Sequence, residues 1–400
     1  MQEERTNVPK IRFKGFTKDW EQRKLINYTK LITKGTTPKD KTGSGKVNFV
    51  KVENLSDGKI LPIQKITEEE HEGYLKRSRL EEGDILFSIA GTLGRTAIVN
   101  KSILPANTNQ ALAIIRSYDF DKYFLVTTLT GHVVAEYIRK NPTVGAQPNL
   151  SLEQVGQLII NTPIKGEQKK IGNFFKQLDD TITLHQRGLD LLKQTKKSYL
   201  QKMFPKKGED KPEIRFAGFT DAWEQRKLGE MVKQFSIKSK KEDEYTVLSS
   251  TNSGMEIRDG RVSGTSNLGY KIVEDGDLVL SPQNLWLGNI NINDIGKGLV
   301  SPSYKTFKFT NINSAFLKPQ LHTSKMLEEY KNSSTQGASI VRRNLELDSF
   351  YQIPMLVPTT EEQSKLGVFF ESMDNTITLH QRELDSLKEM KKSLLQQMFV

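Results

Sequence analysis

Two stretches of the chain carry apolar residues at the alternating four- and three-residue spacing of a coiled-coil seam. The first covers residues 171–203 and the second residues 366–398, and eight of ten seam positions are apolar in each. The spacing predicts two helices of roughly 33 to 37 residues, about 50 to 55 Å long. The predicted seam residues are Ile171, Phe175, Leu178, Ile182, His185, Leu189 and Leu192, and then Leu366, Phe370, Met373, Ile377, His380, Leu384 and Leu387.

The chain is an internal duplication. IRFKGFTKDWEQRKL at residues 11–25 returns as IRFAGFTDAWEQRKL at 214–228, with 12 of 15 positions identical. The helical stretches at 174–204 and 369–399 share 21 of 31 positions. Between these repeated ends the halves diverge, although EEGDILF at 81–87 echoes EDGDLVL at 274–280. We take each Gly-Asp pair as a turn that leads into a buried strand.

Each predicted helix needs a partner for its seam. One alternative is that each helix belongs to a helical core within its own half. We favour pairing of the two helices with each other, antiparallel, because the nearest identical seam is the other copy. His185 and His380 then lie near the midpoint as polar seam residues that fix the register, a structural rather than a chemical role, and Lys196 and Lys391 invite the same interpretation.

The duplication and the paired helices predict two related domains separated by two long helices in an antiparallel coiled coil, with internal pseudo-two-fold symmetry. The predicted domains are 1–162, a central helix at 163–204, a Pro- and Gly-containing linker at 205–213, a second domain at 214–357 and a C-terminal helix at 358–400.

Composition narrows the class of protein. The chain has 400 residues, 59 Lys+Arg against 48 Asp+Glu, a net charge of +11 and no cysteine. The missing cysteine excludes disulfides, thiolate zinc and thiol catalysis, and fits a reducing cytoplasm. No apolar run approaches the roughly 18 residues that a membrane span needs. The positive charge is compatible with a polyanionic partner.

Catalytic patterns are missing from the sequence. No two of the five histidines are spaced to share a metal on one helix turn, so no metal ligands are predicted. TGSGKV at 42–47 lacks the first glycine of a phosphate-binding loop, and there is no GxSxG motif. The sequence favours recognition over catalysis, and no catalytic residue is predicted.

The segments between the repeated ends, which differ between the two halves, carry side chains suited to binding DNA. Arg and Lys neutralise phosphates, and Arg, Asn and Gln can make two-pronged contacts to base edges. The candidates in the first half are Lys34, Thr36, Thr37, Lys39, Lys51, Asn54, Arg77, Arg95, Asn107, Asn109 and Gln110. Those in the second half are Arg258, Arg261, Gln283, Asn284, Trp286, Tyr304, Lys305, Gln336, Arg342 and Arg343.

The features that carry a family resemblance are the duplicated WEQRKL segments, the 34–38 loop, the two Gly-Asp turns and the Pro…Glu-Gln segments before the helices. In these features the chain resembles the specificity subunit of a type I restriction–modification system. The resemblance implies the α+β fold class, with two mixed α/β target-recognition domains separated by the two long helices. It implies that each domain binds one half of a split DNA sequence. It also implies that two methyltransferase subunits holding S-adenosylmethionine assemble with this chain, and that motor-nuclease subunits using ATP and Mg²⁺ can join them.

In that family the specificity subunit binds no cofactor and is not an enzyme, and the helices set the gap between half-sites. Because the two middles differ, the two half-sites are expected to differ. A rival from another class is a non-catalytic, two-headed protein–protein adaptor with the coiled coil as its strut. Only the Arg-, Asn- and Gln-rich middles and the family likeness favour DNA over that adaptor.

Overall fold

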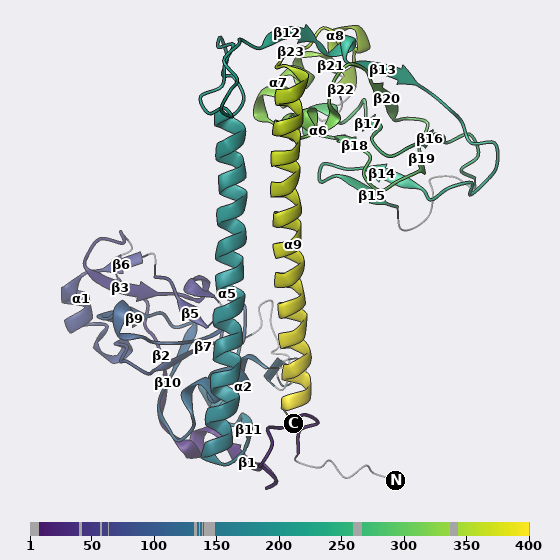
Figure 1. The fold of residues 1–400 in the computed structure, drawn as a ribbon. Coiled ribbons are helices and arrows are strands. Elements are labelled where there is room, and N and C mark those ends of the chain that lie inside the picture. Colours follow the sequence, from purple (N-terminus) through teal and green to yellow (C-terminus); the bar gives the residue numbers. More distant parts are fainter. Residues whose placement is uncertain are drawn as a thin grey trace. The chain divides into compact units, whose positions relative to one another are not determined.

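The computed structural model describes residues 8–39, 42–56, 58–62, 64–131, 134, 135, 137, 139, 149–258, 266–336 and 343–399. The chain divides into two compact units. Unit 1 comprises Met1–Gly188 and Gln381–Val400, and unit 2 comprises Leu189–His380. Both boundaries fall inside the long helices α5 (Lys165–Lys202) and α9 (Thr360–Met398), so each helix contributes to both units (Figure 1).

Unit 1 is built around a four-stranded antiparallel sheet with the order β2-β10-β7-β8. Unit 1 also contains a three-stranded sheet with the order β6-β3-β9 and a two-stranded pair, β1-β11. The bounds are β1 (Glu21–Lys24), β2 (Thr29–Lys34), β3 (Val47–Val50), β4 (Leu55–Ser56), β5 (Lys59–Ile60), β6 (Gln64–Ile66), α1 (Glu68–Glu72), β7 (Ile85–Ser88), β8 (Thr96–Ile98), β9 (Ala106–Thr108), β10 (Leu112–Tyr118), α2 (Lys122–Thr130), α4 (Leu152–Gly156) and β11 (Ile159–Thr162).

Unit 2 repeats the central sheet with the order β13-β20-β17-β18, and repeats the β1-β11 pair as β12-β23. It differs in its outer strands, which form the pairs β14-β15, β16-β19 and β21-β22. The bounds are β12 (Glu224–Lys227), β13 (Val232–Phe235), β14 (Leu248–Ser250), β15 (Met255–Ile257), β16 (Lys271–Val273), β17 (Leu278–Leu280), β18 (Ile290–Ile292), β19 (Gly298–Val300), β20 (Lys305–Phe309), α6 (Ser314–Leu317), α7 (Ser324–Asn332), β21 (Ser334–Gln336), β22 (Arg343–Leu345), α8 (Leu347–Tyr351) and β23 (Pro354–Val357).

The core of unit 1 joins the beginning of α5 to the end of α9. Phe175 of α5 and Phe399, next to the end of α9, have ring centroids 5.8 Å apart. Phe399 also contacts Trp20 and Phe124, at 6.0 and 5.8 Å. Burying these large rings together removes apolar area from water, which is the main force that holds the helix ends to the domain.

The core of unit 2 uses the equivalent residues from the opposite helices. Phe204, which follows α5, lies 5.6 Å from Phe370 of α9, 5.9 Å from Trp223 and 5.8 Å from Phe316. The predicted antiparallel pairing of the two helices is therefore confirmed within each unit. The alternative, a helix confined to the core of its own half, is wrong, because each unit takes helical segments from both halves.

All predicted seam residues are buried or partly buried, with Phe175 and Leu384 fully covered. In the part of the chain that the structure describes, no helix combines the length and the hydropathy that crossing a bilayer requires.

A buried ion pair ties the opening segment of each half to the start of a long helix. Arg12 donates from Nε and Nη2 to the Glu167 carboxylate at 2.7 and 2.8 Å. Arg215 makes the same two bonds to Glu362, both at 2.7 Å. The repeated WEQRKL segments follow these arginines and form the strands β1 and β12, so the repeated sequence preserves the joint between sheet and helix.

Candidate nucleic-acid interface

The Gly-Asp turns support the central sheets. Asp84, which is buried, accepts from the Glu81 amide at 2.7 Å and from Arg116 Nε and Nη2 at 2.7 and 2.6 Å. Hydrogen bonding to this carboxylate raises the pKa of Arg116. In unit 2, Asp277 accepts from the Glu274 amide at 2.7 Å, and its Oδ1 lies 2.7 Å from Lys308 Nζ. These turns are scaffold, and the loops around them carry the candidate side chains.

In unit 1, the loop after β2 lies against the end of β9. The Gly35 amide donates to Leu112 O at 3.2 Å and the Thr36 amide to Thr108 O at 2.9 Å. A Cβ atom at position 35 would lie 2.1 Å from Thr108 O, so only glycine fits this approach. Lys34 at the end of β2 is exposed, as are Thr37 and Lys39 on the loop, and Thr36 is partly buried.

A second group of candidates gathers at the end of β3. Asn54, predicted as a DNA contact, is corrected by its burial: its Oδ1 accepts from the Lys51 amide at 2.8 Å and shapes the turn. The Asn109 amide donates to Val50 O at 3.3 Å, and Arg95 Nη1 lies 3.4 Å from both Val52 O and Leu55 O. The loops that carry Thr36, Lys51, Arg95 and Asn109 thus converge on one edge of unit 1. Gln110 is exposed, and so is Arg77 in the short 3-10 helix Lys76–Ser78.

Asn107 requires a correction. It is fully buried in β9, and its Nδ2 donates to Leu75 O at 2.8 Å and to Ser78 Oγ at 3.0 Å. Its Oδ1 lies 2.5 Å from His71 Nδ1. Because these bonds occupy the amide inside the domain, Asn107 holds the fold together and offers no surface for a base.

In unit 2, one group of candidates lies on the turn after β17. Gln283 and Asn284 are exposed and Trp286 is partly buried. The Leu345 amide donates to Pro282 O at 3.2 Å, which brings β22 beside this turn. Arg343 begins β22 and donates to Ser334 Oγ at 3.0 Å and to Ser334 O at 2.8 Å.

A separate group surrounds the start of β20. Tyr304 donates its hydroxyl to Ser250 O at 3.2 Å and Lys305 follows it, both partly buried. The Arg258 amide bonds to Val247 O at 2.9 Å. Arg261, Arg342 and the side chain of Gln336 lie outside the described residues. Two lysines that were not predicted, Lys238 and Lys271, lie with Tyr304 and Lys305.

Unit 2 also contains a cleft of about 860 Å³, lined by the end of α5, the early part of α9 and residues 318–326. Two of its lysines pair with its two carboxylates, Lys196 with Asp374 and Lys318 with Asp294 at 2.9 Å, and the lining also contains Lys197, Lys206 and Lys325. The cleft therefore keeps an excess of three lysines over carboxylates in its lining.

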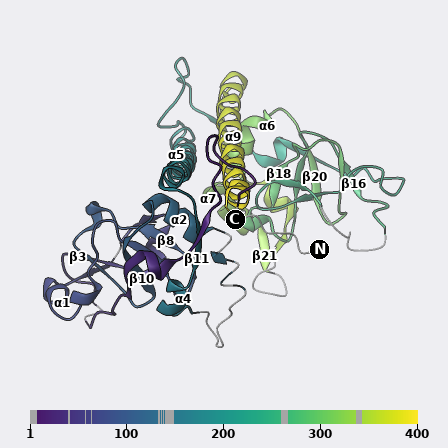
Figure 2. The same cartoon turned by 90° about the horizontal axis from the view of Figure 1, so that it is seen from below.

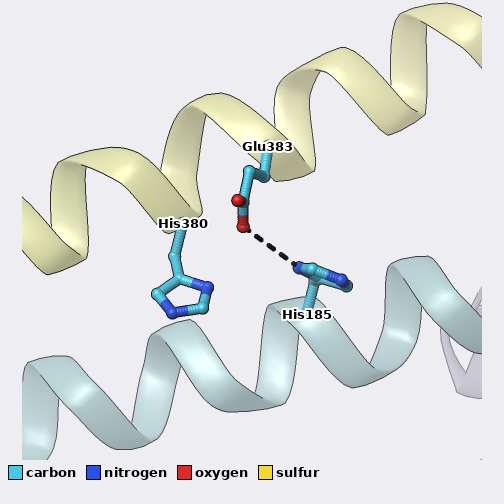
Figure 3. A group of neighbouring side chains, drawn as sticks. All are labelled: His185, His380 and Glu383. Carbon is cyan, nitrogen blue, oxygen red and sulfur yellow. Dashed lines mark ion pairs between the residues drawn. The ribbon is translucent and has the colours of Figure 1, made fainter.

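The polar seam residue of unit 1 contacts the opposite helix. His185 Nδ1 of α5 lies 3.8 Å from Glu383 Oε2 of α9, as the dashed line in Figure 3 marks. Both side chains are partly exposed, at 31% and 45%. The contact links the two helices within unit 1, consistent with a role for His185 in register.

The chain is thus a duplicated α+β protein. Its two long helices pair within each unit, and each unit presents a different set of polar loops. Residues 17–194 match the family model of the type I restriction modification DNA specificity domain. The putative type I restriction enzyme MjaX specificity subunit of Methanocaldococcus jannaschii is 24% identical over 421 residues, which cover 97% of this chain and 95% of that protein. The MjaVIII specificity subunit of the same organism is 24% identical over 412 residues, covering 94% and 91%.

Solved structures agree on the fold. The S subunit of a type I restriction-modification system from M. genitalium matches with a TM-score of 0.64 and 16% identity, over 98% of this chain and 99% of that chain. A second solved structure, which concerns the assembly and conformational transition of the type I R-M system, matches with a TM-score of 0.52 and 15% identity. The match covers 95% of this chain and 97% of that chain. The predicted resemblance to type I specificity subunits is confirmed, and the predicted fold class with it.

Proposed function

We propose that this chain is the sequence-specific DNA-binding subunit of a type I restriction–modification complex and has no catalytic activity of its own. Each unit recognises one half of a split, asymmetric target. Two methyltransferase subunits, which supply S-adenosylmethionine, bind the chain, and motor-nuclease subunits that use ATP and Mg²⁺ join them in the cytoplasm.

The observation that carries this proposal is that one scaffold is used twice with different loops. The two units share the sheet order, the aromatic cluster and the Arg–Glu joint. They differ in the segments that present Lys, Arg, Asn and Gln, such as the 34–39 loop of unit 1 and the 283–286 turn of unit 2. Side chains of these types contact phosphates and base edges, so different loops imply different half-sites.

The repeated surface supports two identical partners. Leu184 on α5 in unit 1 and Leu379 on α9 in unit 2 are equivalent residues in the identical segment TITLHQR, and they are 69% and 57% exposed. An exposed leucine repeated on each helix offers apolar area that a partner can cover. We infer that one methyltransferase subunit binds beside each leucine.

Methylome sequencing of a host that carries this chain with its methyltransferase tests the proposal. The expected result is methylated adenine in a single split motif with unlike halves, absent from a host that carries the methyltransferase alone. Adenine methylation inside a duplex also requires base flipping by the partner. A palindromic motif, or no methylation that depends on this chain, would refute the proposal.

A further inference from the structure

Three lysines of unit 2 come together at the outer strands. Residues 237–239 lie alongside β16, with Ile272 donating to Ile237 O and Ser239 to Tyr270 O, both at 2.8 Å. Lys238 and Lys271 are direct partners in an antiparallel bridge. Directly opposite residues place their Cβ atoms about 4.5 to 5.5 Å apart on one face. Lys271 Nζ donates to Tyr304 O at 2.5 Å, which brings it beside Lys305. Figure 2 shows β16 and β20 within this unit.

This arrangement places like charges together. Lys271 is only 8% exposed. Burial, together with the charges of Lys305 and Lys238, lowers its pKa. Among the residues that the structure describes, none of the three ammonium groups has a carboxylate within ion-pair distance. Directly opposed like charges destabilise a strand pair, so the free protein holds this cluster at an energetic disadvantage.

The fold does not require a charge at this place. Lys271 lies six residues before Asp277, and the residue six before Asp84 in unit 1 is Ser78. Ser78 is fully buried, and its hydroxyl donates to Leu75 O at 3.0 Å and accepts from Asn107. A neutral residue therefore fills the corresponding position, so the shared fold does not depend on a charge there.

The cluster also lies where a DNA contact is expected. Lys238 is on the loop that follows β13, and β13 pairs with β20 as β2 pairs with β10. The end of β2 and the loop after it carry the predicted DNA-binding residues Lys34, Thr36 and Thr37. The corresponding loop of unit 2 thus contributes one of the three cations.

We propose that Lys238, Lys271 and Lys305 bind one phosphate group of the DNA backbone, an assignment that rests on the proposed function. A phosphate offers anionic oxygens to several ammonium donors at once, and such charge-assisted hydrogen bonds are short and strong. Backbone contacts set the position of the protein on the duplex and carry no base information. Occupation by the phosphate relieves the repulsion among the three lysines.

The test uses the full chain assembled with its methyltransferase subunits and a duplex that contains the methylated motif. We expect Lys271→Met to weaken binding to target and non-target duplexes alike by about tenfold, and to reduce the slope of log affinity against log salt by about 0.9. The melting temperature of the chain is expected to change little, because removal of a buried, repelled charge offsets the loss of the hydrogen bond to Tyr304 O. A merely structural lysine would instead lower the melting temperature when removed.

Lys233→Met, an exposed lysine on β13, is the matched control and is expected to leave the salt slope unchanged. Lys305→Met provides a second variant should Lys271→Met fail to fold. If Lys233→Met lowers the affinity and the salt slope as much as Lys271→Met does, the effect is a diffuse effect of charge and the proposed phosphate site is refuted. Inorganic phosphate could stabilise the wild-type chain while Lys271→Met leaves DNA binding unchanged. That result would assign the cluster to a free anion and refute the contact with the DNA backbone.

The outcomes also separate this inference from the proposed function. A wild-type complex that binds no duplex would contradict the function itself. A wild-type complex that binds its target, with a Lys271 variant of unchanged affinity and slope, would contradict only the phosphate site.

Discussion

Lys391 of α9 and Asp179 of α5 form an ion pair in unit 1, with Nζ 2.5 Å from Oδ1. Their equivalents with the helices exchanged, Lys196 of α5 and Asp374 of α9, form the same pair in unit 2. Both lysines occupy seam positions that would otherwise be apolar. The two pairs therefore impose the same antiparallel register at both ends of the helices.

Breaking one pair is expected to have a modest effect on stability. Asp179 and Lys391 are about one-third exposed, at 32% and 27%, so each of Asp179→Asn and Lys391→Met should destabilise the chain by about 0.5 to 1 kcal/mol. Urea unfolding of the single and double variants would measure the coupling. Exchanging the two residues, as Asp179→Lys with Lys391→Asp, should restore most of the loss, and additive effects of the single variants would show that the pair does not set the register.

The buried joint between Arg12 and Glu167 should be far more sensitive. Arg12→Met leaves the fully buried Glu167 carboxylate without its partner, and such a loss costs about 3 to 5 kcal/mol. The double variant Arg12→Met, Glu167→Leu should recover much of this, since it removes both charges. Denaturant unfolding measures both. The matched variants Arg215→Met and Glu362→Leu test the same joint in unit 2, and a single variant as stable as wild type would contradict the account.

Sequence patterns predicted the duplication and the helix pairing because both depend on local periodicity and on self-comparison. They did not show that Phe399 completes the aromatic cluster of Trp20 and Phe124, since a seam defines a face of a helix and not which domain its end enters. Asn107 resembled a base-contacting residue, but its burial follows from the parallel pairing of β9 with β3, a contact between distant segments. Lys271 gave no signal as a single lysine in an apolar strand, because its neighbours come from other parts of the chain.

The exposed leucines should control the number of bound partners. Leu184→Asp places a charge in the inferred contact of unit 1 only, so we expect complexes with one methyltransferase subunit instead of two, measured by native mass spectrometry. Adding Leu379→Asp should abolish binding. Leu191→Asp is the matched control, because Leu191 is 63% exposed but its equivalent is Ser386. Unchanged stoichiometry in the Leu184 variant would refute this assignment.

The two units should recognise their half-sites independently. Replacing residues 26–162 with the corresponding segment of another specificity subunit should change one half of the motif and leave the other, because the loops of unit 1 come from that segment whereas the long helices α5 and α9 do not. Methylome sequencing of the hybrid gives both halves at once. A change in both halves would contradict independent recognition.

The length of the helices should set the gap between half-sites. Inserting four residues after Gly188 in α5 and at the equivalent place after Glu383 in α9 lengthens each helix by about 6 Å. The seam alternates between steps of four and three, so four residues keep the flanking apolar positions close to phase while the added length moves the recognition loops along the duplex. With about 3.4 Å per base pair, we expect an unspecified spacer longer by one or two base pairs and unaltered half-sites, measured by methylome sequencing. Insertion of four residues into the linker at 205–213, which lies outside both helices, is the matched control and should leave the spacer unchanged. If the spacer stays the same in the helix variant, the helices do not act as the ruler.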